Sequence, residues 1–311
     1  MVDNYVWLLC RGRRLRIVGT LSFPLFETMS LPRVFVVGGT GKIGSVVVKE
    51  LLERGAQVTV YARSPEKVQE PKVNVVQGDY SDLTPLKKAV GGHDRLFLLV
   101  VQVPDMDTVK RNISQAAYEA GVKQVVEINA KARGPFRHYE MLIPYTLAER
   151  EIYALANRGA YVTLRPTNFM SNLFFTADSI KKDSTLIDAA APDEPQEWIS
   201  TNDIGRVAAR ILADPVEKHG DAAYELIGDI KTPAERSAIL SKVLERTISY
   251  KQVSAQDLYD HYMQMGSGHA ISYYMATYND VSPLSRGLSI LLGREPETFE
   301  GWAKKNTKAF Q

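Results

Sequence analysis

Short apolar runs alternate, over the first half of the chain, with segments in which apolar residues recur at helical spacing. A continuous apolar run predicts a parallel strand that is covered on both faces. The predicted strands are 34–37, 58–61, 73–76, 96–103, 122–128 and 161–165, and the predicted helices are 46–52, 83–90, 108–120 and 145–158. Strands that alternate with helices in this way predict an α/β fold with a doubly wound parallel sheet of the Rossmann type.

The rest of the chain, from Asn172 onward, shows little strand pattern. Short strands are predicted at 196–199 and 223–227. The first of them is followed by a predicted helix that has Asp203 as its N-cap and ends at Leu212. The remaining pattern is helical, so we expect the C-terminal part to form a smaller, mostly helical lobe.

These patterns divide the chain into three parts. Residues 1–30 are predicted to be a mobile extension, 31–170 the Rossmann core, and 171–311 a substrate lobe from which 196–212 returns to the core. Within the lobe, Gly266-Ser267-Gly268 predicts a flexible break between two helices, where a lid could hinge.

A glycine-rich turn, Gly38-Gly39-Thr40-Gly41-Lys42-Ile43-Gly44, joins the first predicted strand to the first helix. A turn in this position, followed by a second strand, indicates a dinucleotide-binding site. Its glycines permit a tight turn, close approach of the backbone to a pyrophosphate, and close packing of the helix on the sheet. The helix N-terminus offers free N–H groups to the phosphates. We assign cofactor binding to Gly38, Thr40, Gly41, Lys42, Ile43 and Gly44; the alternative is a turn that binds nothing.

The end of the second strand indicates which dinucleotide binds. An acidic residue there would bind the adenosine ribose of NAD. The chain has Arg63 at this point, followed by Ser64 and Lys67. A guanidinium can hold a 2′-phosphate with two hydrogen bonds, whereas a carboxylate would repel it. The sequence therefore favours NADP(H) over NAD(H), and a solvated surface arginine is the alternative.

Further cofactor contacts are expected at the ends of the other strands, because ligands of open α/β sheets lie outside the carboxyl ends of the strands. Asp79 would lie beside the adenine and accept a hydrogen bond from its amine, or else it would cap a turn. The residues assigned to the cofactor at these strand ends are Asp79, Tyr80, Val101, Gln102, Asn129, Pro166 and Asn168.

Lys131 and Tyr145 are the candidate catalytic residues. Lys131 follows the fifth strand and should sit at the mouth of the cleft, and Tyr145 opens the next helix. Either side chain could supply a proton, and desolvation beside a cofactor would lower the pKa of the lysine. The alternative is that Lys131 is solvated and Tyr145 packs against the sheet.

Aromatic residues and methionines concentrate in the last third of the chain: Tyr259, Tyr262, Tyr273, Tyr274, Tyr278, Met263, Met265 and Met275. They could line a wide apolar pocket for an aromatic or polycyclic substrate, or serve ordinary helix packing. The candidate substrate-binding residues are Phe169, Trp198 and Tyr274.

Composition and charge limit the other possibilities. The chain has 311 residues, of which 45% are hydrophobic and 24% charged, and its net charge of +2 does not favour nucleic-acid binding. A single cysteine, Cys10, excludes an internal disulfide and fits a reducing, cytoplasmic location. We expect no membrane partner, because no apolar run reaches the ~18 residues of a membrane span. The five histidines lack metal-ligand spacing, so we expect no metal.

Several segments taken in order resemble the NmrA-like family of atypical short-chain dehydrogenases. They are GGTGKIG, YARSPEK, AGVKQVVEINA and TLRPTNFMSN, with WISTNDIGRVAARIL at 198–212, and the resemblance covers about 34–228. It implies a Rossmann core, NADP(H) binding and a small C-terminal substrate lobe. The family includes quinone and enone reductases, biosynthetic enzymes, and NADP-sensing regulators without catalysis.

The chain departs from the Tyr-x-x-x-Lys pattern that short-chain dehydrogenases often use for proton transfer. Tyr145 is followed four residues later by Glu149, and Tyr139 by Ile143, while Asn129 replaces the usual serine. A hydride transfer to an activated acceptor would not need this machinery.

Together these features predict an NADP(H)-dependent oxidoreductase that transfers hydride to or from a bulky apolar organic substrate. An enone, a quinone, an imine or an iminium would be the acceptor, and secondary metabolism the setting. The alternative is a non-catalytic NADP(H)-sensing regulator that binds a protein partner.

Overall fold

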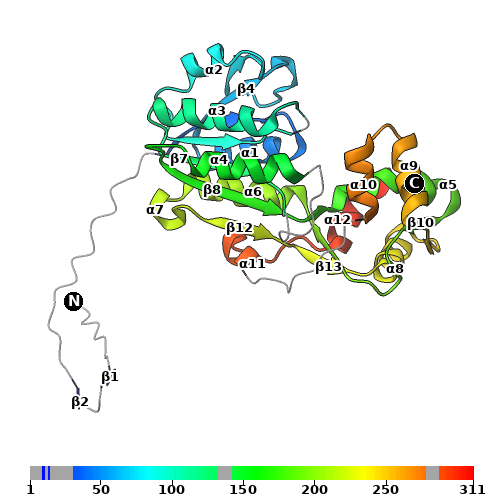
Figure 1. Ribbon diagram of the computed structural model, residues 1–311. Helices are drawn as coiled ribbons and strands as arrows, with labels where there is room; N and C mark the ends of the chain where they lie inside the picture. The colour runs from blue at the N-terminus through cyan, green and yellow to red at the C-terminus, as the bar shows by residue number, and fades with distance from the viewer. Residues whose placement is uncertain (1–8, 11–12, 15–30, 102, 132–141, 278–286) are drawn as a thin grey trace. The chain divides into compact units, whose positions relative to one another are not determined.

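The computed structural model describes residues 9–10, 13–14, 31–101, 103–131, 142–277 and 287–311. Contacts divide the chain into two units, residues 1–30 and residues 31–311. In the first unit, β1 (Leu9–Cys10) and β2 (Arg13–Arg14) form a short antiparallel pair. The second unit carries the elements described below (Figure 1).

The core of the second unit is a seven-stranded parallel sheet in the order β12-β8-β7-β6-β3-β4-β5. Its strands are β3 (Arg33–Val37), β4 (Gln57–Ala62), β5 (Asn74–Gln77), β6 (Arg95–Leu98), β7 (Gln124–Ile128), β8 (Ala160–Pro166) and β12 (Ala223–Leu226). This arrangement confirms the predicted fold class. The strand order reverses between β3 and β6, which is where doubly wound sheets bind their ligands.

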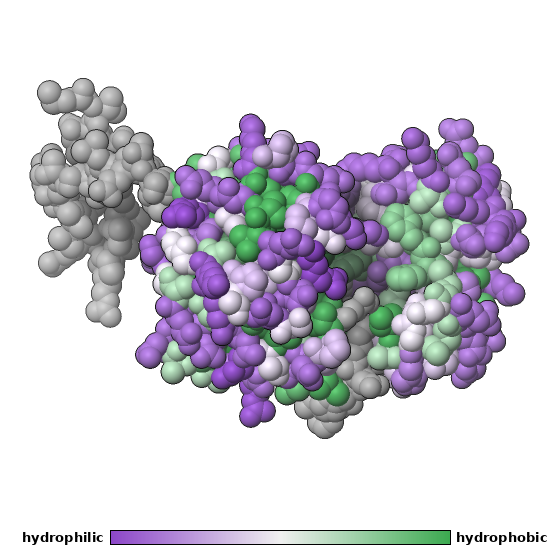
Figure 2. Space-filling view, turned by 90° about the horizontal axis from the view of Figure 1, so that it is seen from above, coloured by the Kyte–Doolittle hydropathy of each residue, from purple (hydrophilic) through white to green (hydrophobic). Residues whose placement is uncertain are grey.

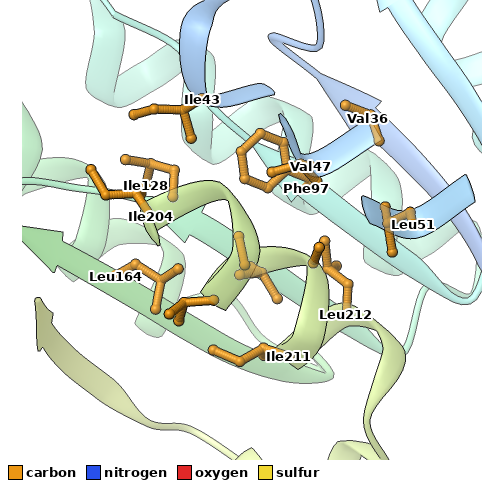
Figure 3. Packing of buried hydrophobic residues seen from close by; sticks show 14 of the residues in the cluster. Val36, Ile43, Val47, Leu51, Phe97, Ile128, Leu164, Ile204, Ile211 and Leu212 are labelled. Carbon is orange, nitrogen blue, oxygen red and sulfur yellow. The ribbon is translucent and has the colours of Figure 1, made fainter. Parts of the chain in front are cut away.

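Helices cover both faces of this sheet. On one face lie α1 (Lys42–Glu53), α6 (Thr201–Ala213) and α11 (Gly287–Leu292); on the other lie α2 (Thr84–Ala89), α3 (Met106–Glu119) and α4 (Ile143–Tyr153). Figure 3 shows side chains of α1 and α6 meeting those of the sheet. A Cβ atom on Gly205 of α6 would lie 2.7 Å from the Cβ of Val46. The glycine therefore allows α6 to pack closely on α1.

The prediction of the fourth strand, 96–103, is too long. β6 ends at Leu98, and the chain then leaves the sheet at its carboxyl edge. Val100 remains buried, but Val101 is 44% exposed. An apolar run does not distinguish residues that pair in the sheet from residues that pack just beyond its edge.

The remainder forms the lobe, which also holds the C-terminus (Figure 1). β9 (Asn168–Phe169), β11 (Gln196–Ile199) and β13 (Asp229–Lys231) form one small sheet, and β10 (Thr185–Asp188) pairs with β14 (Ser249–Gln252). The helices here are η3 (Met170–Thr176), α5 (Ala177–Asp183), α8 (Pro233–Leu244), α9 (Ala255–Gln264), α10 (His269–Thr277) and α12 (Phe299–Lys305). The short helix α7 (Val216–His219) instead lies beside the core sheet, after α6 (Figure 1). Two further short turns are η1 (Pro65–Lys67) and η4 (Thr307–Ala309). The strands β10, β13 and β14 were not predicted, because they are short and mostly only partly buried.

The prediction that Asp203 caps α6 is wrong. Ser200 is the N-cap, and its Oγ accepts a hydrogen bond from the backbone N–H of Asn202 at 3.2 Å. Asp203 lies inside the helix and is fully buried, where it pairs with Arg294 and accepts the N–H of Glu297 at 2.6 Å. Its carboxylate therefore anchors the C-terminal segment to α6.

The predicted break between two lobe helices is confirmed. It separates α9 from α10, and both Gly266 and Gly268 adopt positive φ, +81° and +73°. Side chains at these two positions would meet no atom within 4 Å. In the part of the chain that the structure describes, no helix combines the length and the apolar character that crossing a membrane requires.

Candidate functional site

The glycine turn lies between the carboxyl end of β3 and the first turn of α1. Gly38 has a φ of +86°, and a Cβ there would lie 2.4 Å from the carbonyl oxygen of Leu99, just past β6. A Cβ on Gly44 would lie 2.1 Å from the carbonyl oxygen of Gly38. These two positions therefore require glycine if the turn is to close against the sheet and the helix. At Gly41 the nearest atom to a Cβ is 3.6 Å away, so the protein leaves room there.

A groove of about 250 Å³ runs beside this turn. It is lined by Gly39, Thr40, Gly41, Lys42, Ser45 and Lys67, among others. Lys67 was not assigned to the cofactor from the sequence, although it lies four residues after Arg63. Its position adds a second cation to the region in which a 2′-phosphate is expected.

Arg63 is exposed at the end of β4, near Asp79 and Tyr80. Asp79 accepts hydrogen bonds from the backbone N–H and the hydroxyl of Ser81, at 2.7 and 2.5 Å. These bonds lower the pKa of Asp79, and the charge of Arg63 adds a smaller decrease. Burial raises the pKa of Tyr80, and Arg63 opposes that increase. The Asp79 carboxylate thus stabilises the turn that contains Ser81. Its contact with adenine stays a prediction.

At the ends of β7 and β8, the polar side chains bind one another. Asn129 donates to the Glu149 carboxylate at 3.1 Å and to the backbone oxygen of Tyr145 at 3.2 Å. Arg165 donates to the same carboxylate through Nε at 3.1 Å and also through Nη2. Glu149 stands four residues after Tyr145, where the dehydrogenase pattern would place a lysine. That position therefore holds a carboxylate neutralised by Arg165.

The expectation that Lys131 sits at the mouth of the cleft is wrong. Its side chain is buried, and its ammonium group pairs with Glu197 of β11. Thr167 donates to the same carboxylate at 3.0 Å. A buried lysine needs such a partner, because an isolated charge away from water is very costly. Its role in proton transfer remains a prediction.

Tyr145 is half-buried in α4 and packs against the apolar cluster on the α3 face of the sheet. The Nζ of Lys110 lies 4.6 Å from its ring centre and 2.6 Å from Glu127, to which Tyr161 also donates. Burial raises the pKa of Tyr145 to about 12, and the charge of Glu127 contributes to that increase. Whether this phenol donates a proton likewise stays a prediction.

A cavity of about 310 Å³ lies in the lobe, between η3, β10, β11, α8, α9 and α10. Trp198 and Tyr274, two of the residues predicted to bind substrate, line it together with Tyr262 and Met275. Asn168, which was predicted to bind the cofactor, also lines it. Phe169 packs against the apolar core of the sheet instead. In Figure 2 the surface is hollowed between the part that carries the core sheet and the lobe, and hydrophobic residues gather on the lobe side of the hollow.

The wall of this cavity is more polar than the predicted wide apolar pocket. Arg236 of α8 lines it and is 2% exposed, with its guanidinium 4.6 Å from the Trp198 ring centre. Its Nη2 donates to Asp188 at 2.6 Å and to Gln196. These polar residues come from separate elements. The clustering of aromatic residues along the sequence therefore did not predict that they line the cavity.

The other residues that were predicted to bind the cofactor or the substrate lie apart from one another near the carboxyl edge of the sheet. Pro166 is buried, and its carbonyl oxygen accepts the N–H of Lys131 at 3.1 Å. Ile43 belongs to the apolar core beneath the turn. Gln102 and Tyr278 lie outside the described residues. Among the residues that are described, no group of three or more His, Cys, Asp or Glu side chains could hold a metal ion.

Comparison with known proteins identifies the family. A model of the NmrA-like family matches residues 31–303. The NAD(P)H azoreductase of Xenophilus azovorans is 28% identical over 287 residues, which cover 89% of this chain and 99% of that protein.

Two solved structures show the same fold. Citrobacter sp. triphenylmethane reductase, complexed with NADP(H), superposes with a TM-score of 0.76 at 21% identity, over 88% of this chain and 99% of that chain. The negative transcriptional regulator NmrA, in complex with NADP, gives a TM-score of 0.72 at 18% identity, over 89% and 95%. Because the family model spans most of its residues, the chain belongs to the NmrA-like family.

Proposed function

We propose that this protein is an NADP(H)-dependent oxidoreductase that transfers hydride to or from an organic substrate held in the lobe. One observation carries the proposal: the glycine turn and the cavity both lie at the carboxyl side of the sheet, and Asn168, just past β8, lines the cavity. A dinucleotide that extends from the turn across the strand ends would bring its nicotinamide toward that cavity.

The residues at the turn fit such a cofactor. Gly38 and Gly44 keep the backbone close to the sheet, and the space at Gly41 leaves the turn open to a pyrophosphate. Arg63 and Lys67 are exposed cations on the side where the 2′-phosphate of NADP(H) would lie. When bound, the cofactor would supply or accept hydride at nicotinamide C4.

The polar groups at the strand ends support a reaction without the usual tyrosine–lysine pair. Glu149 accepts hydrogen bonds from Asn129 and Arg165, and Lys131 pairs with Glu197. These side chains are therefore engaged with one another at the carboxyl ends of the strands. Placement and orientation of the reactants can supply much of the reduction in the barrier.

A cavity of about 310 Å³ lined by Trp198, Tyr262 and Tyr274 supports an aromatic or otherwise bulky substrate. The azoreductase and the triphenylmethane reductase act, by their names, on compounds of this kind. We place the reaction of this chain in secondary metabolism and its substrate among quinones, enones, imines and iminium ions.

A screen of NADPH oxidation tests the proposal. The purified chain is mixed with NADPH and, separately, with menadione, an azo dye and a triphenylmethane dye, and the loss of NADPH absorbance is followed. Oxidation of NADPH that depends on one of these acceptors supports the proposal. Tight NADPH binding with no oxidation across the panel would instead favour the regulator, for which the fold of NmrA is a precedent.

A further inference from the structure

Tyr262 of α9 is a buried phenol at the wall of the cavity. It lines the cavity together with Asn168 and Trp198, and its side chain is 6% exposed. Its ring packs edge-on against Phe175, with 6.1 Å between the ring centres. In the described part of the chain, no group forms a hydrogen bond with its hydroxyl. The hydroxyl oxygen is not sealed off from solvent, so a molecule bound in the cavity can accept its hydrogen bond.

Two neighbouring donors on the same wall also lack acceptors among the described residues. They are the indole Nε1 of Trp198 and the guanidinium Nε of Arg236, whose side chains are 6% and 2% exposed. The other end of the Arg236 guanidinium is already bound to Asp188 and Gln196. Both nitrogen atoms are themselves buried, so they do not compete with the Tyr262 hydroxyl for an acceptor oxygen in the cavity.

The charges on this wall disfavour an anionic acceptor. Arg236 is the cation among the described residues that line the cavity; the carboxylate of Asp188 pairs with it, and Glu194 adds a second carboxylate to the lining. An added carboxylate or phosphate would have to compete with Asp188 for that cation. A carbonyl oxygen can accept hydrogen bonds here without adding a charge.

We propose that Tyr262 is a catalytic residue that donates a hydrogen bond to the carbonyl oxygen of a neutral quinone or enone and stabilises the negative charge that develops on it. This inference rests on the proposed function and narrows its substrate class. Burial, and then the charge of Asp188, raise the pKa of Tyr262, while Arg236 opposes this. The hydroxyl therefore keeps its proton at neutral pH and remains a donor.

The chemistry balances for a quinone as follows. Hydride forms an O–H bond at one carbonyl oxygen of the quinone as the C4–H bond of NADPH breaks, and an electron pair moves through the ring onto the other carbonyl oxygen. That oxygen gains the Tyr262 proton, and the tyrosinate regains a proton from water. One NADPH, one proton and one quinone thus give NADP⁺ and one hydroquinone. A cationic dye carbon, by contrast, is neutralised by hydride alone and needs neither an oxyanion donor nor a proton.

This difference provides the test. Wild type and Tyr262→Phe are compared with NADPH and either menadione, a neutral quinone, or malachite green, a triphenylmethane cation without oxygen. We expect kcat with menadione to fall about 100-fold, since loss of one oxyanion donor typically costs ~10²–10³. The rate with malachite green and the NADPH affinity should change less than about threefold. Tyr259→Phe is the matched control, because this hydroxyl, on the same helix, bonds His269 at 3.0 Å and does not line the cavity.

The assignment would be overturned if Tyr262→Phe kept the wild-type rate with menadione, or if its rate fell equally with menadione and malachite green. It would also be overturned if Tyr145→Phe, and not Tyr262→Phe, lost the menadione rate. If wild type reduces neither acceptor, the proposed function fails, and binding still tests Tyr262. Menadione is then titrated into the NADP⁺ complex and followed by quenching of tryptophan fluorescence. Weaker binding by about 2–10-fold in Tyr262→Phe supports the hydrogen bond. No difference between the two proteins contradicts it.

Discussion

The ammonium group of Lys131 is bonded to the carboxylate of Glu197, and both side chains are almost completely excluded from water. Lys131 lies just past β7 of the core sheet, whereas Glu197 belongs to β11 of the small sheet. The pair therefore ties the two sheets together at the edge where the cofactor is proposed to bind. A lysine held in this way fixes the segment after β7 against β11.

We predict that Lys131→Met lowers the free energy of unfolding by about 3–5 kcal/mol, because it removes the ammonium group that faces the buried Glu197 carboxylate. Urea unfolding followed by circular dichroism measures the change. The double variant Lys131→Met/Glu197→Gln removes both charges and should recover much of the loss. A single variant of normal stability whose turnover falls ~10²–10⁴-fold would instead support Lys131 as a proton donor.

Arg63→Ala should weaken NADPH binding roughly tenfold or more and leave NADH binding nearly unchanged, because the lost hydrogen bonds reach the 2′-phosphate that NADH lacks. Lys67→Ala should act in the same direction but less strongly, since an ammonium offers no bidentate contact. Fluorescence titration with both cofactors measures this. Lys72→Ala is the control, as this exposed lysine lies away from the glycine turn. Equal weakening of NADPH and NADH would rule out the 2′-phosphate contact.

Gly41→Ala should impair cofactor binding, whereas Gly44→Ala should lower the stability of the fold. The protein leaves 3.6 Å around a Cβ at position 41, so this variant should fold normally but lose NADPH binding, because its methyl group occupies the place of the pyrophosphate. At Gly44 a Cβ would meet the backbone at 2.1 Å, so that variant should lose about 1–3 kcal/mol of stability or more. Thermal unfolding and cofactor titration separate the two effects. Gly91→Ala, where a Cβ meets nothing within 4 Å, is the control. Retained NADPH affinity in Gly41→Ala would place the dinucleotide elsewhere.

The free energy of unfolding should decrease in acid, partly because the Asp221 carboxylate becomes protonated. Arg158 donates two hydrogen bonds of 2.8 Å to its carboxylate, and the backbone N–H of Tyr161 donates a third at 2.9 Å. The bonds from Arg158, and then that from Tyr161, lower the pKa of Asp221 although partial burial opposes them. Because the pKa is lower in the folded state, this contribution is complete above about pH 4 and is lost as the pH falls further.

Asp221→Asn should therefore be less stable than wild type at neutral pH, and the difference should shrink as the pH falls toward ~2. Urea unfolding at a series of pH values measures it. Asp178→Asn is the control, because Asp178 and its partner Lys182 are both 71% exposed and such pairs contribute little. A difference for Asp221→Asn that stays constant from neutral to acid pH would contradict the assignment.

The sequence by itself determined the parallel sheet, the glycine turn and the family. These features depend on local pattern: a buried strand is a short apolar run, and a position that must accept a positive φ or a close backbone contact, such as Gly38 or Gly44, needs glycine. The same local information located Arg63 at the end of β4 and the break between α9 and α10. It also identified Trp198 and Tyr274, which the structure places at the cavity.

The tertiary structure decided which side chains are paired and which face the cavity. Lys131 and Glu197 are 66 residues apart in the chain, and Arg236 is 48 residues from Asp188. No periodicity along the sequence encodes such a contact, because burial and pairing of charges depend on elements that meet after folding. For the same reason a lysine expected at the cleft mouth became a buried partner of Glu197, and Tyr262, one tyrosine among several in the sequence, became the buried phenol of the cavity wall.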